Sequence, residues 1–413
     1  MVAHSATQAW QGGQRELALQ QVAQQTCWDV VVIGGGITGA GIFREAARRG
    51  YKVLLLEQRD FAWGTSSRSS KMVHGGLRYL GSGQLGLARD SVRERQRLLA
   101  ELPGLVDPLP FMMGHYRGKF PGPWLFGKLL AVYDYLAGKR YRRTLRHDLS
   151  TFWAPGINTQ QLEAISGFGD AVTDDARLVM RVLEAGVSDG GLALNYVRAG
   201  ALLEKNGRVS GVRVQDQMRG TELEIHAGLV VNATGVWTDQ LRQQLGHEQV
   251  IRPLRGSHLV LPFWRLPVGG SFSFFHPLDK RPVFVFPWEG TTVIGTTDLD
   301  HDQDLDREAA ITQGEVAYLL DAANAQFPQS GVTPEDVIAT WSGVRPVVSK
   351  NQQGVSATDK HDPSDEKREH AIWDDRGMIS VAGGKLTTYR LIAEEVLAKG
   401  GFNLSATRAS LSA

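Results

Sequence analysis

The stretch that most constrains the fold is residues 29–57, DVVVIGGGITGAGIFREAARRGYKVLLLE. A short apolar run, a glycine-rich turn, a helix-forming stretch and a second apolar run follow one another and end on Glu57. Continuous apolar runs are typical of parallel strands buried on both faces, and parallel strands need a crossover such as a helix. The order therefore predicts a βαβ unit, and with it an α/β fold.

The turn between the first strand and the helix has the spacing GxGxxG, at Gly34, Gly36 and Gly39. The first glycine permits a tight turn, the second lets the backbone approach a pyrophosphate, and the third lets helix and strand pack closely. The helix N-terminus attracts phosphate. Glu57 can accept hydrogen bonds from a ribose diol. Together these features predict dinucleotide binding in a Rossmann-like domain.

The residues after Glu57 favour FAD over NAD as the dinucleotide. Instead of a further βαβ repeat, residues 64–81 read GTSSRSSKMVHGGLRYLG, and no helical or strand pattern of apolar positions runs through them. Their hydroxyl groups and glycine amides suit a pyrophosphate and a flavin ring. A flexible surface loop is the alternative that composition alone leaves open.

Composition narrows the class of protein. The chain has 413 residues, 42% of them apolar, and a formal net charge of +1. It can therefore form a large core with two connected domains, and its charge argues against a general attraction to nucleic acid. The single cysteine, Cys27, cannot form an intramolecular disulfide, and we interpret it as a buried small residue or a loop residue. No Cys/His cluster has zinc spacing, so no metal is expected.

The N-terminal residues 1–27 are polar and lack the features of a secretory signal. No stretch approaches the roughly 20 apolar residues of a spanning helix. We therefore expect a cytoplasmic protein whose membrane contact, where present, is peripheral.

Several blocks resemble the FAD-dependent glycerol-3-phosphate dehydrogenases. Beside GGGITGAG and GTSSRSSKMVHGGLRYL, they are DDARLV at 174–179, VNATGVW at 231–237, RGSHLVLP at 255–262, PWEGTTVIGTTD at 287–298, SGVRP at 342–346 and GGKLTTYR at 383–390. The resemblance covers roughly residues 28–400, and HGGLRYL, SGVRP and GGKLTTYR are its most specific parts. Family members usually carry a further helical C-terminal domain, which we expect to be mostly absent from this chain.

The resemblance implies a glycine-oxidase-like flavoprotein, α/β in its cofactor domain and α+β overall. We expect a discontinuous FAD-binding domain at 28–110, 170–250 and 335–400, a substrate domain with an antiparallel sheet at 111–169 and 251–334, and an N-terminal extension at 1–27. Local patterns agree with this division. They predict a hairpin at 197–214 turning at Asn206-Gly207, strands at 228–232 and 379–382, helices at 307–327 and 389–399, β-rich segments within 251–299, and a polar loop at 350–370.

The implied reaction is oxidation of sn-glycerol 3-phosphate to dihydroxyacetone phosphate, with hydride transfer from C2 to flavin N5 and electrons passed to a quinone. Such a site needs cations for the phosphate and an acceptor for the hydroxyl proton. Arg345 and Lys385 are the phosphate candidates, and Arg78 is a third. His74 is the leading base, because imidazole titrates near neutrality, although a hydrogen-bonded core histidine is the alternative. His258 is the second candidate.

The catalytic set is thus His74, His258 and Arg345, and Arg78, Tyr79, Arg345 and Lys385 are expected to bind substrate. The residues expected to bind FAD are Gly34, Gly36, Ile37, Thr38, Gly39, Glu57, Gln58, Thr65, Ser66, Ser67, Ser70, Lys71, His74, Gly75, Gly76, Ala233, Thr234, Gly235, Trp237, Gly343, Gly384, Lys385, Leu386 and Thr387.

Residues 117–143, RGKFPGPWLFGKLLAVYDYLAGKRYRR, interleave aromatic and basic side chains. This composition suits an anionic membrane surface, on the inner face of the cytoplasmic membrane in the family. A core helix followed by a solvated basic turn fits equally well. Quinone is the implied acceptor, and oxygen stays open. The sequence does not define the oligomeric state, so a homodimer also stays open.

Two other functions remain as alternatives. An amine or amino-acid oxidase of the same flavoprotein class would explain the glycine turn and the sheet domain, but not HGGLRY, SGVRP and GGKLTT together. A non-catalytic FAD-binding module is supported only by the expected lack of the C-terminal domain.

Overall fold

The computed structural model describes residues 15–145, 150–349 and 370–405. The chain divides into two compact units. The first comprises Met1–Ser67, Asp175–Leu254 and Val344–Ala413, and the second comprises Arg68–Asp174 and Arg255–Gly343. Each unit has its own sheet. Among the described residues, no helix has both the length and the apolar character needed to cross a membrane.

The first unit is built on a mainly parallel sheet, with the strands in the order β17-β18-β10-β1-β2-β7. Their bounds are β17 Ala371–Asp375, β18 Met378–Ala382, β10 Glu222–Asn232, β1 Trp28–Ile33, β2 Val53–Leu56 and β7 Leu192–Leu194. All but β17 run parallel. The prediction of an α/β unit with a Rossmann-like parallel sheet is confirmed.

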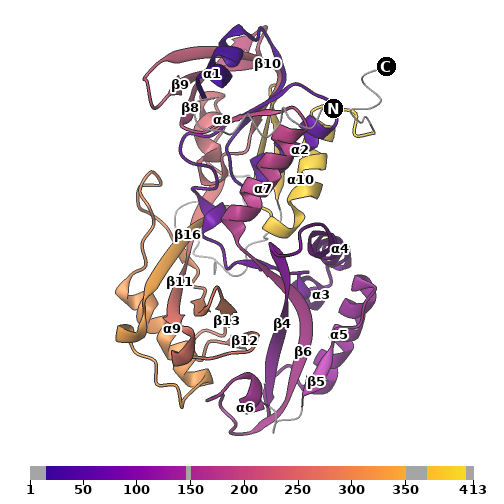
Figure 1. Ribbon diagram of the computed structural model, residues 1–413, viewed down its shortest axis with the longest axis vertical. Coiled ribbons are helices and arrows are strands. Elements are labelled where there is room, and N and C mark those ends of the chain that lie inside the picture. The colour runs from indigo at the N-terminus through magenta and orange to yellow at the C-terminus, as the bar shows by residue number, and fades with distance from the viewer. Residues whose placement is uncertain (1–14, 146–149, 350–369, 406–413) are drawn as a thin grey trace. The chain divides into compact units, whose positions relative to one another are not determined.

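Helices cover one face of this sheet. The crossover helix α2 (Ile37–Arg48) packs against both α7 (Asp175–Ser188) and α10 (Tyr389–Lys399) (Figure 1). The helices approach closely: a Cβ on Gly41 of α2 would lie 2.7 Å from the ring of Tyr389. Glycine at this position allows α10 to lie against α2.

The other face carries a second apolar cluster that includes Val31, Ile33, Leu54 and Leu56 of the central strands. Helices α1 (Arg15–Gln24) and α8 (Thr238–Gln244) and the hairpin β8–β9 add side chains to it. The hairpin joins β8 (Val197–Lys205) to β9 (Arg208–Asp216). Asn206 and Gly207 both have positive φ, +53° and +75°. The predicted Asn-Gly hairpin is therefore confirmed.

The second unit contains a larger mixed sheet, with the strands in the order β15-β11-β14-β13-β12-β4-β6-β3. Their bounds are β15 Leu299–Asp300, β11 Ile251–Pro262, β14 Thr291–Gly295, β13 Pro282–Trp288, β12 Ser271–Phe275, β4 Val106–Tyr116, β6 Leu162–Thr173 and β3 Met72–Val73. Strands β5 (Arg143–Leu145) and β16 (Ala339–Val348) pair with β6 and β11. The strands β11 to β14 pair antiparallel, as predicted for 251–299.

Both faces of this sheet are covered. Val285 and Ile294 face a cluster that includes Leu319 and Phe327, from α9 (Gln313–Gln326) and its end. Their neighbours Phe286 and Val293 belong to the opposite cluster, which α3 (Leu77–Gly81), α4 (Leu85–Glu101) and α5 (Pro123–Ala137) complete. The alternation is the period of two expected of strands buried on both faces.

Several expectations need correction. Residues 68–110, assigned to the FAD domain, lie in the second unit, because β3 and β4 both pair with β6. Residues 170–174 and 335–343 also belong there, and 251–254 belong to the first unit. Helix α9 begins at Gln313 rather than at 307, since Thr312 forms a capping box with Glu315.

Two smaller expectations also change. Helix α3 lies inside the stretch 64–81, where the sequence shows no helical pattern. Its five residues are too few for a periodic pattern to emerge. Cys27 is an exposed residue before β1, which excludes the interpretation as a buried residue. The predicted loop at 350–370 lies, except for its last residue, outside the described residues.

Candidate functional site

In the first unit, the parallel strands end on a shared edge of the sheet. Strand β1 leads into Gly34, β2 into Glu57, β10 into Ala233 and β18 into Gly383. In open α/β sheets, ligands bind beyond this edge, at the point where the strand order reverses. Here that point is β1, which has β2 on one side and β10 on the other.

The glycine turn is packed too tightly for side chains. A Cβ on Gly34, whose φ is +113°, would lie 2.4 Å from the carbonyl oxygen of Ala233. A Cβ on Gly39 would lie 1.9 Å from the carbonyl oxygen of Gly34. Gly36 is the extended N-cap of α2 and, as a glycine, has no side chain to cap the helix itself. Its first-turn amides therefore face the edge of the sheet at which β1 ends.

Glu57 is fixed beside this turn by backbone amides. Its Oε2 accepts a hydrogen bond from Gly35 N at 2.7 Å, and its Oε1 accepts one from Arg59 N at 2.8 Å. Burial raises the pKa of Glu57, and these amides oppose the increase only in part. The carboxyl group at the end of β2 is thus held at the ligand-binding edge.

The serine-rich stretch contacts the start of α2. Ser66 Oγ accepts a hydrogen bond from Ile37 N at 2.9 Å, and the Thr65 hydroxyl donates to the carbonyl of Val344. Both residues belong to the short 3-10 helix Thr65–Ser67. These contacts argue against a loop that lies free on the surface, and they bring the hydroxyl groups to the helix N-terminus.

The turn after β10 rests on a fully buried asparagine. Asn232 Nδ2 donates to Thr238 O at 2.9 Å, while its Oδ1 accepts from the Thr234 hydroxyl at 2.7 Å. Asn232 Nδ2 also donates to Ser380 Oγ of β18 at 3.3 Å. One side chain therefore fixes the ends of two strands that lead to the edge.

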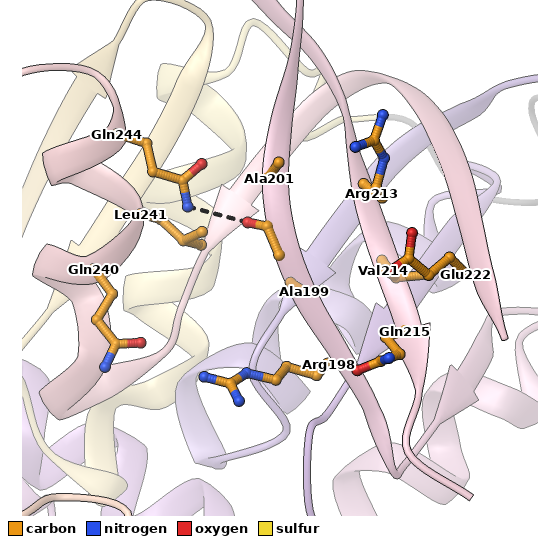
Figure 2. Close-up of a pocket in the computed structure, with 11 residues that line it drawn as sticks. Arg198, Ala199, Ala201, Arg213, Val214, Gln215, Glu222, Gln240, Leu241 and Gln244 are labelled. Carbon is orange, nitrogen blue, oxygen red and sulfur yellow. Dashed lines mark hydrogen bonds between the residues drawn. The ribbon is translucent and has the colours of Figure 1, made fainter. Parts of the chain in front are cut away.

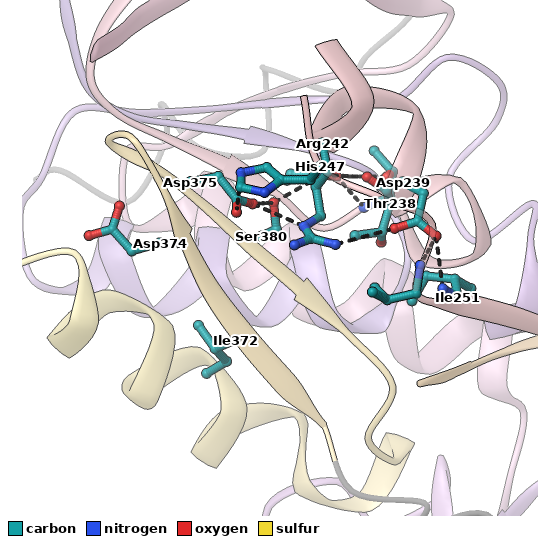
Figure 3. Close-up of polar contacts among 12 residues, drawn as sticks. Thr238, Asp239, Arg242, His247, Ile251, Ile372, Asp374, Asp375 and Ser380 are labelled. Atoms are coloured by element: carbon teal, nitrogen blue, oxygen red, sulfur yellow. Dashed lines mark hydrogen bonds and ion pairs between the residues drawn. The ribbon is translucent and has the colours of Figure 1, made fainter. Parts of the chain in front are cut away.

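A buried polar network extends from Ser380 (Figure 3). The Ser380 hydroxyl donates to Asp375 Oδ2 at 2.6 Å, and Arg242 Nε donates to the same oxygen at 3.2 Å. Asp239, also paired with Arg242, accepts from Ile251 N at 2.8 Å. Because its charges are paired inside the first unit, we interpret this network as support for the strands.

The turn after β18 reverses the chain through two glycines. Gly383 and Gly384 have φ of +79° and +83°. Lys385 follows as the N-cap of a 3-10 helix, Leu386–Thr388, and its carbonyl accepts from Thr388 N at 3.1 Å. This turn places a lysine at the end of the strand next to β10.

Comparison with known proteins identifies the dinucleotide that binds at the ends of these parallel strands. Residues 29–390 match the family described as FAD dependent oxidoreductase. The chain belongs to this family. Its cofactor is FAD, as the serine-rich stretch after Glu57 predicted.

The relatives include an aerobic glycerol-3-phosphate dehydrogenase from Staphylococcus haemolyticus, 36% identical over 377 residues. That alignment covers 90% of this chain and 66% of the relative, so the chain spans about two thirds of the relative's length. The structure of glycerol-3-phosphate dehydrogenase from Bacillus halodurans complexed with FAD matches with a TM-score of 0.76 and 31% identity, covering 96% of this chain and 69% of that one.

A glycine oxidase structure from Geobacillus kaustophilus shares the fold. It matches with a TM-score of 0.64 and 19% identity, over 93% of this chain and 99% of that chain. This likeness confirms the predicted glycine-oxidase-like architecture.

The first unit fits FAD. The glycine turn leaves no room for side chains, the first turn of α2 offers amides to a pyrophosphate, and Glu57 can exchange its amide partners for ribose hydroxyls. The residues that would hold FAD here are the predicted ones of the first unit: Gly34, Gly36, Ile37, Thr38, Gly39, Glu57, Gln58, Thr65, Ser66, Ser67, Ala233, Thr234, Gly235, Trp237, Gly384, Lys385, Leu386 and Thr387.

The remaining predicted FAD residues belong to the second unit. They are Ser70, Lys71, His74, Gly75, Gly76 and Gly343. The expectation that all FAD residues would lie in one domain is therefore wrong. Of the predicted substrate and catalytic residues, Arg345 and Lys385 lie in the first unit, while Arg78, Tyr79, His74 and His258 lie in the second.

His258 is enclosed in the second unit. Its Nε2 shares a hydrogen bond with Ser70 Oγ at 2.9 Å, and its ring stacks on Trp341 at 4.9 Å between centroids. A Cβ on Gly295 would lie 2.1 Å from its Cδ2. The side chain is only 1% exposed. Lys71, also buried, points its ammonium group at the rings of Trp288 and Trp341 from 5.2 and 5.1 Å.

His74 follows β3 and is only partly buried. Gly76, with φ of +75°, is the N-cap of α3, which carries Arg78 and Tyr79. Arg78 is exposed. Within the second unit, His74 is therefore better placed than His258 to meet a small molecule.

The sequence patterns gave no sign of a buried charged network that includes Ser257, the chain neighbour of His258. Glu315 of α9 accepts from Arg255 Nη2 at 2.9 Å and from the hydroxyls of Ser257 and Thr297, each at 2.8 Å. Burial raises the pKa of Glu315, but these donors outweigh it and hold the pKa below its ordinary value. The T-x-x-E pattern at 312–315 was a detectable signal for the capping box, although not for the ion pair.

One cavity of the first unit lies away from these motifs. It occupies about 410 Å³ between β8, β9 and α8 in the first unit (Figure 2). Its polar lining consists of arginine, glutamine and glutamate side chains: Arg198, Arg213, Gln215, Glu222, Gln240 and Gln244. None of the predicted site residues lines it, so we assign it no part in the chemistry.

Proposed function

We propose that this chain oxidises sn-glycerol 3-phosphate to dihydroxyacetone phosphate with FAD. The observation that carries the proposal is the 36% identity, over 377 residues, to aerobic glycerol-3-phosphate dehydrogenase. The geometry of the first unit supports it, because the dinucleotide turn and the lysine of GGKLTT occupy the same edge of one sheet. When bound, FAD would supply the two-electron acceptor for the hydride that leaves C2 of the substrate.

We propose Arg345 and Lys385 as the groups that bind the phosphate dianion. A guanidinium offers a planar fork of donors, and an ammonium offers a compact point charge. Arg345 follows Val344, whose carbonyl accepts the hydrogen bond of Thr65, so its backbone is fixed to the serine-rich stretch. Arg78 is the proposed third cation.

We propose His74 as the acceptor of the C2 hydroxyl proton. A neutral imidazole can take this proton near neutral pH. His258 is the less suitable candidate, because Ser70, Trp341 and Gly295 enclose it. Its position suits a residue that supports the site rather than one that meets substrate.

The test is an anaerobic visible spectrum of the purified holoprotein before and after adding glycerol 3-phosphate. Loss of the oxidised flavin band is the expected result, and glycerol and glycine serve as controls. Bleaching by glycine alone would instead identify an amino-acid oxidase. A flavin band that none of the three reduces would indicate a binding module.

We also propose peripheral docking of this protein on an anionic membrane, with a membrane quinone as the electron acceptor. Helix α5 and the segment just before its start expose large apolar side chains: Phe120, Trp124, Leu125, Val132 and Tyr135. Exposed basic residues flank them, and a cavity of about 300 Å³ beside α5 is lined by Arg140, Arg142 and Arg143. Basic groups around exposed aromatics suit an anionic headgroup layer.

Vesicle flotation tests this docking. Vesicles containing phosphatidylglycerol should bind the protein at low salt, and phosphatidylcholine vesicles should not. The double variant Trp124→Ala/Tyr135→Ala should lose binding while keeping its flavin. Equal flotation of the variant and the wild type would exclude α5 as the docking surface.

A further inference from the structure

A buried cluster in the second unit contacts the segment that carries His74. It consists of Asp170 on β6, Arg95 on α4 and Tyr133 on α5, and we call it the Asp170 cluster. The three elements pack together in the second unit (Figure 1). Arg95 and Tyr133 are each 1% exposed and Asp170 is 4% exposed, so none of them can meet a substrate directly.

One carboxylate oxygen is the centre of this cluster. Asp170 Oδ1 accepts hydrogen bonds from Gly75 N at 2.9 Å, from the Tyr133 hydroxyl at 2.7 Å and from Arg95 Nη1. Arg95 Nη1 also donates to the carbonyl of Gly169 at 2.7 Å. The cluster is therefore a buried Arg95–Asp170 ion pair whose carboxylate also accepts a hydrogen bond from the backbone amide of Gly75, the residue after His74.

The segment is also held by close packing. A Cβ on Gly75 would lie 2.3 Å from the Tyr133 hydroxyl and 2.7 Å from Val92 Cγ2. A Cβ on Gly76 would lie 2.6 Å from the ring of Tyr79. Gly75 is required by the lack of space rather than by its backbone conformation, because only Gly76 has a positive φ. The backbone after His74 is thus pressed against the cluster.

A buried ion pair is weak evidence for stability, because an apolar core of similar volume often serves as well. The position of this pair suggests a role in catalysis instead. Asp170 accepts a hydrogen bond from Gly75, the residue next to His74, and small displacements of a catalytic group reduce rates strongly.

We propose that the Asp170 cluster positions His74 for proton abstraction, with Asp170 and Tyr133 as positioning residues. The inference rests on the proposed function, since it gives the cluster a role in that reaction. Asp170 holds the Gly75 amide by a hydrogen bond. Tyr133 donates to the Asp170 carboxylate and packs against Gly75.

Tyr133→Phe is the decisive variant, because it keeps the ring and removes only the hydroxyl. The expected result is a loss of about tenfold in the limiting rate of flavin reduction, smaller than the ~100-fold that a 1 Å misplacement can cost. The substrate concentration for half-maximal rate and the FAD content should stay at wild-type values. Hydrogen exchange of the peptide containing Gly75, followed by mass spectrometry, should become faster.

Tyr318→Phe is the matched control. Its hydroxyl donates to both carboxylate oxygens of Asp279 at 3.0 Å, so it also removes a tyrosine–aspartate hydrogen bond in the second unit. It should change neither the reduction rate nor the exchange of the Gly75 peptide. Asp170→Asn is the second variant, and it should lower the rate at least as much as Tyr133→Phe.

The outcomes separate this inference from the proposed function. If Tyr133→Phe and Asp170→Asn fold, bind FAD and are reduced at the wild-type rate, the cluster does not position His74. Faster hydrogen exchange of the Gly75 peptide in Tyr133→Phe, with an unchanged rate of flavin reduction, would also overturn the inference. If glycerol 3-phosphate fails to reduce the wild type, the proposed function fails, and unchanged exchange in Tyr133→Phe would still show that the cluster does not hold the segment.

Discussion

The two units form their polar centres in different ways. In the first unit, the candidate FAD site consists of backbone amides, glycines and single side chains that directly follow parallel strands. In the second unit, the polar centre consists of side chains from separate elements, such as Ser70 with His258 and Arg95 with Asp170. A site built at strand ends leaves a local sequence pattern, whereas one built across a sheet does not.

The largest effect is expected from the second unit. His74→Ala should lower the rate of flavin reduction by glycerol 3-phosphate by about 10²- to 10⁴-fold, the range that a general base contributes. FAD content should remain unchanged, because the glycine turn, Glu57 and the serine-rich hydroxyls that would hold FAD lie in the first unit. Rapid-mixing absorbance under anaerobic conditions measures the rate.

If His74→Ala retains the native rate, the base assignment is wrong. If the variant loses FAD instead, His74 contributes to FAD binding. The division between a cofactor site in the first unit and a catalytic base in the second would then be less sharp.

A smaller effect is expected from the turn of the first unit. Gly39→Ala places a Cβ 1.9 Å from the carbonyl oxygen of Gly34, and overpacking of this kind typically costs about 1–3 kcal/mol. The variant should purify with much less FAD and unfold at lower temperature. Flavin absorbance per protein and thermal unfolding are the measurements.

Gly86→Ala is the control for this substitution. Gly86 lies in α4, and a Cβ there would have no neighbour within 4 Å. Replacing a helical glycine by alanine typically stabilises by roughly 0.5–1 kcal/mol. Equal FAD content in both alanine variants would show that the close packing of Gly39 is unimportant for the cofactor.

The smallest effect concerns pH. Because burial raises the pKa of Glu57 above its ordinary value, its carboxylate is protonated at a higher pH than that of an ordinary glutamate. In the apoprotein, a carboxyl group whose pKa is raised by folding lowers the folding stability at any pH above its pKa in the unfolded chain. This loss of stability becomes smaller as the pH falls. FAD binding should respond in the opposite direction, because a protonated carboxyl is a weaker acceptor for ribose hydroxyls.

The dissociation constant of FAD should therefore rise by a few fold as the pH falls through the raised pKa of Glu57. Glu57→Gln should bind FAD more weakly at neutral pH and lose this pH dependence. Fluorescence titration of apoprotein with FAD measures both. The same pH dependence in wild type and variant would mean that Glu57 does not hold the ribose.

The same contrast explains what the sequence could predict. The βαβ unit, the Asn206-Gly207 hairpin and α10 each depend on neighbouring residues, so their patterns are visible in the chain. The assignment of 68–110 depends on the pairing of β3 and β4 with β6, at distant positions in the chain, which no local pattern encodes.

The buried charges were missed for a related reason. Arg95 lies among charged residues on α4, and its sequence neighbours give no sign that its side chain is buried. Asp170 stands between Gly169 and Ala171 on β6, and no charged residue within two positions of it signals an ion pair. Only the packing of α4 and α5 against β6 brings the two together.

The most direct test of the central claim is an anaerobic titration of the holoprotein with glycerol 3-phosphate, in which reduced flavin and dihydroxyacetone phosphate are both quantified. The account predicts one dihydroxyacetone phosphate formed for each flavin reduced. Flavin that stays oxidised at saturating glycerol 3-phosphate, or that is reduced without forming this product, would contradict it.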